Sequence, residues 1–227
     1  MFEQALSLIS SRHSSRSFAP KKVPRDVIER ILEAAAKSPS SQNNQPWSVV
    51  VVTGEPLRIL SRRLLDAYDA KLPPTPDYKN RSDMSSMQQK GIDAFAHHWF
   101  TNSNGLKRDD TQGRRSVHRG NFSFFGATTH LIVSIPAESA EGTFIDIGMY
   151  VQNILILAHA AGLGALPQYS VASYANLIRE SVKGLIGRTI ICGISLGYTN
   201  EPLEGKMGPV RHDTSEYVSW LGFEDFA

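Results

Sequence analysis

The chain has 227 residues, of which 41% are hydrophobic and 20% are charged, enough for a full core in one large domain or two small ones. Its 24 basic and 22 acidic residues leave a net charge of only +2, so the chain as a whole offers no electrostatic basis for nucleic-acid binding. No apolar run reaches the roughly 18 residues of a membrane span, and the N-terminus lacks the pattern of a secretory signal. We therefore expect a cytoplasmic protein that does not enter a membrane.

The first third of the chain alternates between helical and strand-like hydrophobic patterns. Apolar residues within residues 2–9 predict a short helix, and those within 23–35 recur with the 3.6-residue period of a second helix. A run of valines predicts a strand over residues 47–52, and residues 55–70 form the next predicted helix.

The stretch SPSSQNNQPW (residues 38–47) separates the second helix from the first strand. It is longer and more polar than an ordinary helix-to-strand connection, which needs about 2 to 6 residues. Its small hydroxyl and amide side chains allow two interpretations: a plain surface loop, or the wall of a site for something polar and uncharged. Pro46 is expected to hold the residue before it in extended backbone, and Trp47 to anchor the loop in the core.

The middle of the chain changes character twice. The hydrophobic pattern loosens over residues 71–120, where turn-rich and highly charged stretches predict an insertion or lid. A second strand is predicted around residues 131–135. Residues 145–161 are apolar nearly all round, which predicts a buried helix.

The last third contains two further strands and a polar-aromatic tail. We predict a short strand over residues 164–170, a helix over 174–182 and a strong strand over 189–196. The tail after residue 212 is rich in aromatic side chains, which are costly to leave in water.

Helices and strands mix without a regular βαβ alternation, which favours an α+β fold. We expect a single domain over residues 1–227, with a helical insertion or lid at about 71–120 and a C-terminal arm at about 205–227. The apolar helix and the aromatic tail suggest that part of the core is shared between subunits. A homodimer is therefore predicted.

The common catalytic signatures are missing from this sequence. It contains no phosphate-binding P-loop, no HExxH and no GxSxG motif, and GLGALP follows a helix where a dinucleotide fingerprint follows a strand. The seven histidines have no metal-ligand spacing, so we expect no metal site. Cys192, the only cysteine, lies in an apolar strand-like run and is expected to be a buried structural thiol.

Two basic clusters remain as candidate sites. Arg12, His13, Ser14, Ser15 and Arg16 place two guanidiniums and two hydroxyls within five residues, a combination suited to phosphate. Lys206 and Arg211 form the second cluster. The alternative for both is that they are ordinary solvated surface charges.

Four segments occur together in one order: RHSSRSF, SPSSQNNQPW, the apolar helix with QN before GLGALPQYS, and ICGISLGY. In this order they resemble the nitroreductase family that depends on flavin mononucleotide (FMN). The tract GNFSFFGATTHLIVSIP resembles in particular its nitrobenzoate-reductase branch. The resemblance implies an α+β fold with a central, mostly antiparallel sheet surrounded by helices, and an intertwined homodimer with two FMN sites at its interface.

The resemblance also implies roles for residues that match the family's segments. Arg12, His13, Ser14 and Arg16 would hold the flavin phosphate and ribityl chain. Arg211 would join them from the C-terminal segment, where Gly208 stands in place of the first of two arginines and Lys206 is the candidate substitute. Pro39, Ser40 and Ser41 would reach the partner subunit's flavin, and Asn43 and Gln45 the polar edge of the ring. Pro167, Gln168, Tyr169 and Ser170 would pass along the ring, with a backbone N–H near N5. Asn153 is a further candidate, with satisfaction of a neighbouring backbone group as its alternative.

This resemblance accounts for the missing catalytic acids and nucleophiles, because the flavin carries the chemistry. It implies ping-pong hydride transfer from NADH or NADPH through flavin N5 to a small aromatic acceptor, a nitroaromatic compound or a quinone. Tyr78, Arg81 and Phe100 are candidates for contact with the acceptor, with lid packing and surface charge as the alternative for each. Dehalogenation, enone reduction and flavin storage without turnover are the competing functions.

Overall fold

The structure, a computed structural model, describes residues 1–78, 83–203 and 208–223. The chain divides into two compact units, one formed by Met1–Lys79 with His118–Lys206 and the other by Asn80–Val117 with Met207–Ala227. The second unit is built from the segments that the sequence marks as insertion and arm. A single domain over the whole chain stays a prediction.

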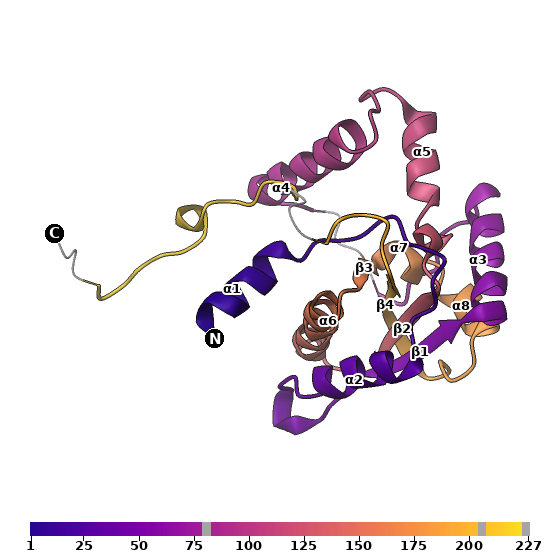
Figure 1. Cartoon of the computed structure of the whole chain (residues 1–227), viewed down its shortest axis with the longest axis horizontal. Coiled ribbons are helices and arrows are strands. Elements are labelled where there is room, and N and C mark those ends of the chain that lie inside the picture. The colour runs from indigo at the N-terminus through magenta and orange to yellow at the C-terminus, as the bar shows by residue number, and fades with distance from the viewer. Residues whose placement is uncertain (79–82, 204–207, 224–227) are drawn as a thin grey trace. The chain divides into compact units, whose positions relative to one another are not determined.

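A four-stranded antiparallel sheet forms the centre of the first unit (Figure 1). The strand order is β1-β2-β4-β3, and every neighbouring pair is antiparallel. All four predicted strands are confirmed, as β1 (Ser48–Thr53), β2 (Thr129–Pro136), β3 (Gly164–Gln168) and β4 (Arg188–Gly197). β2 and β4 occupy the centre, and both are buried along most of their length, whereas the edge strand β1 is only partly buried.

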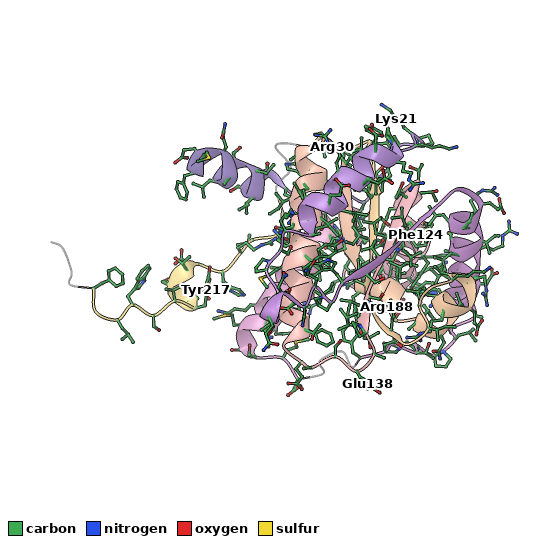
Figure 2. The ribbon with its side chains drawn as sticks, turned by 90° about the horizontal axis from the view of Figure 1, so that it is seen from below. Lys21, Arg30, Phe124, Glu138, Arg188 and Tyr217 are labelled. Atoms are coloured by element: carbon green, nitrogen blue, oxygen red, sulfur yellow. The ribbon has the colours of Figure 1, made fainter. Side chains whose placement is uncertain are left out.

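Helices cover both faces of this sheet (Figure 1). Leu131 and Val133 of β2 share one core cluster with α2 (Arg25–Ala35) and α6 (Thr143–Ala160), while Ile132 belongs to the cluster on the other face. This alternation follows from the two-residue period of a strand. The opposite face carries α3 (Gly54–Asp69), α7 (Tyr169–Ala172) and α8 (Ala175–Ser181). Figure 2 shows Phe124 inside this second cluster, where it is 1% exposed.

The prediction that the helix over residues 145–161 is buried holds for one face only. Ile147, Tyr150 and Ile154 of α6 pack into the core, but Ile145 on its outer side is 68% exposed. Among the described residues, α6 is the one helix long and apolar enough by composition to cross a membrane, and 39% of that window is buried. A helix packed in the core of a globular unit passes the same test, so the property adds no support for a membrane.

Shorter elements complete the first unit. α1 (Phe2–Ser11) has no buried residue, and its apolar residues lie on one exposed side. The 3₁₀ turns η1 (Ser41–Asn43) and η3 (Phe124–Gly126) precede β1 and β2. Cys192 on β4 is buried, and burial raises the pKa of its thiol to about 12, which confirms the predicted structural thiol.

The second unit is helical. It contains α4 (Ser86–Ala96), the π-helical turn η2 (His97–Asn102), most of α5 (Thr111–Arg119) and the 3₁₀ turn η4 (Thr214–Glu216). Ser85 begins α4 with a capping box, in which Ser85 and Gln88 satisfy each other's backbone N–H groups. Glu216 lies 4.0 Å from Lys90, so the C-terminal segment packs on α4 within this unit.

Candidate functional site

The basic segment that follows α1 lies alongside β3. Ser14 forms a parallel bridge with Ala165, and the backbone N–H of Ser15 donates to the Ala165 carbonyl at 3.2 Å. Because β3 continues directly into residues 167–170, the structure brings the predicted groups 12–16 and 167–170 onto neighbouring backbone segments. These two groups are 150 residues apart in the sequence but belong to one site region.

Gly164 makes this close approach possible. A Cβ atom at position 164 would lie 2.6 Å from Oγ and 2.8 Å from Cβ of Ser15, closer than real contacts allow. Ser15 is completely buried, and its Oγ has no hydrogen-bond partner within the described ranges. The sequence-based assignment named Ser14 and omitted Ser15, because the alternation of an extended segment against a neighbouring strand is visible only once the bridge to β3 is known.

His13 is the second residue of this segment with an unsatisfied polar atom. Its Nδ1 donates to the Ser11 carbonyl at 3.3 Å, whereas Nε2 is buried without a partner in the part of the chain that the structure describes. The ring of His159, from the last turn of α6, lies 6.5 Å away edge-on and bonds the Ser11 hydroxyl at 2.8 Å. Ser11 and His159 also line a cavity of about 620 Å³ between α1 and the end of α6.

The two guanidiniums of the segment are half-buried. Burial lowers the pKa of Arg16, and the carboxylate of Glu201 opposes this by raising it. Positively charged groups that are partly removed from water, next to buried polar atoms without partners, are typical of an anion-binding site. The residues present therefore fit a ligand that carries a phosphate and hydroxyl groups, since such a ligand offers both donors and acceptors.

Gln168 faces away from this segment, into the core. Its Oε1 accepts from the Ser195 hydroxyl at 2.5 Å, and its Nε2 donates to the Asn121 carbonyl at 3.0 Å. Gln168 is 2% exposed, so its side chain fixes the backbone of residues 167–169 and does not itself line a site. The expectation that Gln168 passes along a ring can hold for its backbone alone.

His130 closes the same buried network from β2. Since the Ser195 proton goes to Gln168, Nδ1 of His130 must be the donor in its 3.3 Å bond to Ser195, and Nε2 carries the lone pair. Burial lowers the pKa of His130 to about 3, so the ring is neutral at physiological pH. Gly193 leaves room for it, because a Cβ there would lie 2.2 Å from Nε2.

The loop of residues 38–47 is held by α6. Ser38 is buried, where its hydroxyl accepts from Asn153 at 2.7 Å and donates to the Ala35 carbonyl. The backbone N–H of Ser41 donates to the carboxylate of Asp146 at 3.2 Å. Asn153 thus bonds a buried side-chain hydroxyl and not the backbone group that the sequence raised as its alternative, and Asp146 is an anchor that sequence reasoning did not identify.

Within the loop, the polar side chains are largely exposed. Gln45 donates its backbone N–H to the Ser40 hydroxyl at 3.0 Å, and closing the loop this way places Gln45 at φ 46°. The expectation of extended backbone before Pro46 is therefore wrong. Trp47 stacks on Tyr150 with ring centroids 4.7 Å apart, which confirms it as the anchor of the loop.

The two predicted groups contact opposite ends of α6. Asp146 in the first turn holds the loop, whereas His159 in the last turn lies beside His13. Thirteen residues of α-helix span about 20 Å. The Ser41 contact therefore lies far from residues 12–16 within one chain, whereas Ser38, at the start of the loop, bonds Asn153 nearer the middle of the helix.

The remaining candidates are dispersed. Tyr78 packs edge-on against Tyr169 at 5.4 Å and donates its hydroxyl to the Ile191 carbonyl at 2.6 Å; burial raises the pKa of this hydroxyl. Phe100 and Arg211 belong to the second unit, where Arg211 bonds the Pro209 carbonyl at 2.9 Å. Arg81 and Lys206 lie outside the described residues.

Comparisons with known proteins agree on one family. Residues 9–198 match the Nitroreductase family. The chain is 32% identical to a 4-nitrobenzoate reductase of Nocardioides sp., covering 96% of this chain and 90% of that one, and 33% identical to one of Pseudomonas putida, covering 96% of each. It also superposes on the FMN-dependent nitroreductase NfnB from Mycobacterium smegmatis in complex with NADPH, with a TM-score of 0.90 and 26% identity over 97% of this chain and 99% of that one.

Proposed function

This chain belongs to the nitroreductase family, and we propose that it is an FMN-dependent oxidoreductase that uses NADH or NADPH to reduce nitroaromatic compounds or quinones. The observation that carries the proposal is the group of polar side chains beside β3 whose hydrogen bonds are not all made. Buried atoms of His13 and Ser15 lack partners within the described residues, and two guanidiniums belong to the same short segment. A phosphate with an attached polyol supplies the missing partners.

We assign the parts of the cofactor to residues accordingly. Arg12, His13, Ser14 and Arg16 would hold the phosphate and ribityl chain, and the role of Arg211, which belongs to the second unit, stays a prediction. When bound, FMN supplies the hydride-transfer chemistry between NAD(P)H and the acceptor at its N5 position.

The segment Pro167–Ser170 lies along the ring in this assignment. Its backbone is rigid because Gln168 is held from behind by Ser195 and Asn121. A fixed backbone N–H directed at the redox nitrogen stabilises added negative charge without reorganising. Tyr78, which contacts Tyr169, is the candidate in the first unit for the wall of the acceptor site. A cytoplasmic location stays a prediction.

We further propose that the site is completed by a second copy of the chain. Pro39, Ser40, Ser41, Asn43 and Gln45 would then contact the flavin held by the other copy's basic segment. The separation of about 20 Å along α6 between Asp146, which holds Ser41, and His159, which lies beside His13, supports this. Exposed apolar side chains such as Ile145 of α6 and Leu221 and Phe223 of the tail supply surface for such an interface.

The function is tested by mixing the purified yellow protein with NADPH under anaerobic conditions and then adding 4-nitrobenzoate. We expect the flavin absorbance to bleach with NADPH and to return when the nitro compound is added, with the acceptor consumed in proportion. Bleaching without reoxidation by any nitroaromatic or quinone would contradict the acceptor class. A protein that binds FMN but shows no bleaching would support flavin storage.

A further inference from the structure

A series of hydrogen bonds between side chains runs through the core behind residues 167–170. Nδ1 of His130 on β2 donates to the Ser195 hydroxyl on β4 at 3.3 Å, and Ser195 donates in turn to Oε1 of Gln168 on β3 at 2.5 Å. Nε2 of Gln168 then donates to the carbonyl of Asn121 at 3.0 Å and to its side-chain Oδ1 at 3.2 Å. We call these four residues the His130 network. All its bonds donate in one direction, from His130 toward Asn121.

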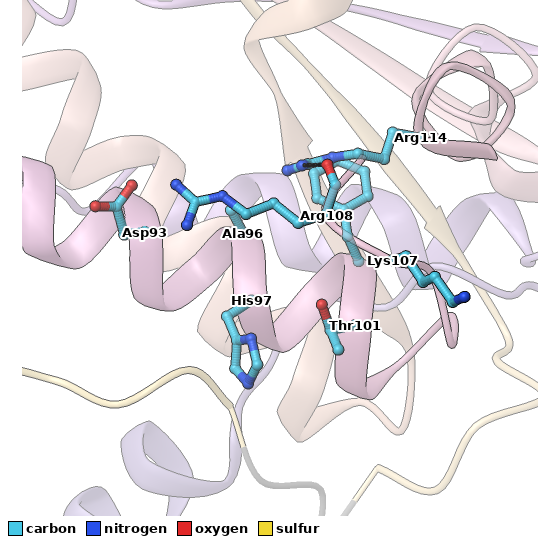
Figure 3. Close-up of a pocket in the computed structure, with 8 residues that line it drawn as sticks. Asp93, Ala96, His97, Thr101, Lys107, Arg108 and Arg114 are labelled. Atoms are coloured by element: carbon cyan, nitrogen blue, oxygen red, sulfur yellow. Dashed lines mark hydrogen bonds between the residues drawn. The ribbon is translucent and has the colours of Figure 1, made fainter. Parts of the chain in front are cut away.

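The network is closed to water over most of its length. His130 and Ser195 are completely buried, and Gln168 is nearly so, which means that solvent cannot replace a bond that is lost. The polar side chains of the second unit are different, because they line a cavity of about 350 Å³ at which Lys107 and Arg108 are exposed (Figure 3). Water can satisfy those side chains, whereas the His130 network depends on its own geometry.

The network acts on the backbone at the end of β3. Gln168 pairs with Gly193 of β4, and the missing Cβ of Gly193 leaves the space that the His130 ring occupies. Gln168 has extended backbone with φ −131° and ψ 98°, and α7 begins at the next residue, Tyr169. The chain therefore changes direction at the peptide group between Gln168 and Tyr169. Because the Gln168 side chain is bonded at both its oxygen and its nitrogen, it restricts the orientation of that peptide group.

We propose that Ser195 and His130 are positioning residues that set the reduction potential of the bound flavin through Gln168. The inference rests on the proposed function, in which the backbone of residues 167–170 directs an N–H at flavin N5. Ser195 holds the Gln168 side chain, and His130 donates to Ser195 so that the Ser195 proton is directed to Gln168. Neither side chain is at the surface that would receive the flavin, because both are completely buried within the chain.

The expected direction of the effect follows from preorganisation. A donor that is already oriented stabilises the negative charge added on reduction without a cost for reorganisation. A donor that is free to move loses part of this advantage, so the protein binds reduced FMN less tightly relative to oxidised FMN. Since the His130 ring is neutral, it contributes through position and adds no charge near the flavin.

The reduction potential of the FMN-loaded protein, measured by anaerobic titration against a reference dye, tests the proposal. We expect Ser195→Ala to lower the affinity for reduced FMN relative to oxidised FMN about tenfold, which makes the two-electron potential about 30 mV more negative. Ser134→Ala is the matched control, because Ser134 is another completely buried serine of the same sheet whose hydroxyl accepts from Arg188 at 2.9 Å, outside the network. The control should lose stability but keep its potential.

A double variant tests whether His130 acts through Ser195. His130→Leu removes the donor to Ser195 and should lower the same affinity ratio about threefold. The double change His130→Leu with Ser195→Ala should shift the potential no further than Ser195→Ala alone, because the two residues act in series. Shifts that simply add would overturn the role of His130.

An unchanged potential in Ser195→Ala, or an equal shift in Ser134→Ala, would overturn the proposal. If Ser195→Ala does not fold, Asn121→Ala is the milder variant, because it removes only the partly buried Oδ1 acceptor of Gln168. It should shift the potential in the same direction by a smaller amount, and no shift would likewise overturn the proposal. A protein that takes up no FMN would contradict the proposed function and this inference together, whereas FMN uptake with the same potential in every variant would overturn the inference alone.

Discussion

The two ends of α6 carry polar segments that differ in how far the chain itself satisfies them. At the first turn, residues 38–47 are complete: Ser38, Ser40 and Ser41 all have partners, and the loop exposes the rest to solvent. At the last turn, residues 12–16 are incomplete, with buried atoms of His13 and Ser15 unsatisfied within the described ranges. Burial without a partner costs about 1 to 3 kcal/mol for each group, which the chain tolerates only where something else supplies the bond.

The difference indicates separate roles for the two segments. The incomplete segment is built to receive a ligand inside the chain, and the complete loop is built to present its side chains outward. If both serve one FMN, as proposed, the loop must serve the FMN of another copy. Predictions can therefore be made for each end separately.

The largest expected effect is on FMN binding by residues 12–16, beside the last turn of α6. Arg12→Ala removes a guanidinium assigned to the phosphate, which should cost about 2 to 5 kcal/mol of FMN binding, or about thirtyfold or more in affinity. Fluorescence titration with FMN measures this, with Arg25→Ala on α2 as the control. If Arg12→Ala purifies as yellow as the unchanged protein, the phosphate assignment is wrong.

Gly164→Ala tests the contact that places this segment on β3. The added methyl group would collide with Ser15, so we expect a loss of about 1 to 3 kcal/mol in the free energy of unfolding, together with weaker FMN binding. Gly142→Ala is the control, because no atom lies within 4 Å of its built Cβ. Urea unfolding of the two variants should separate them, and equal stability would show that the approach of Ser15 to β3 is not tight.

His130 sharpens the comparison, because its Nε2 is also unsatisfied but lies in the core beside Phe124. Its folded pKa of about 3 is below the ordinary 6.5, so the unfolded state binds the proton first as the pH falls. The stability that the neutral His130 contributes is fully present above the pKa of the unfolded state. It is lost as the pH falls toward the pKa of the folded state. We expect a loss of about 2 kcal/mol near pH 5 relative to neutral pH.

His130→Gln removes this titration and is the variant for comparison. Urea unfolding at both pH values should show a smaller loss of stability in the variant than in the unchanged protein. The same pH dependence in both proteins would mean that His130 takes up its proton in the folded state.

The smallest expected effect is on the stability of the loop of residues 38–47, which the first turn of α6 holds. Asp146→Asn weakens the bonds that hold Ser41, at a cost of about 1 kcal/mol, and should speed proteolysis within residues 38–47. Asp26→Asn is a matched control, since Asp26 is likewise in a first helical turn but on the exposed surface of α2. Cleavage of the loop at the same rate in both variants would show that Asp146 does not hold it.

Hydrophobic periodicity predicts the strands and helices of this chain and its α+β class, because buried strands and helices of 3.6-residue period leave strong local patterns. The antiparallel sheet was expected only from the resemblance to the family. Periodicity does not reveal which segment of the chain a given side chain faces. The bridge between Ser14 and Ala165 pairs residues 151 positions apart, so the burial of the Ser15 side chain and the inward direction of Gln168 have no local signal. The apolar character of α6 similarly predicts burial, but not that one face of the helix is left exposed.

The candidate site was predictable to the extent that it follows the family's segments. Residues 12–16 and 167–170 were identified from RHSSR and PQYS, and the structure places them together. The anchors behind them were not, because Asp146, Ser195 and His130 act through neighbours that are distant in sequence.

The central claim is that one FMN site uses the basic segment of one chain and the polar loop of another. Two variants, Arg12→Ala and the double change Asn43→Ala with Gln45→Ala, each damage every site in their own homodimers. When the two are unfolded together and refolded, random pairing produces mixed dimers in which one of the two sites is intact, so about a quarter of all sites should bind FMN tightly. Fluorescence titration of the mixture would contradict the shared site if it shows no more tight binding than the two variants measured separately.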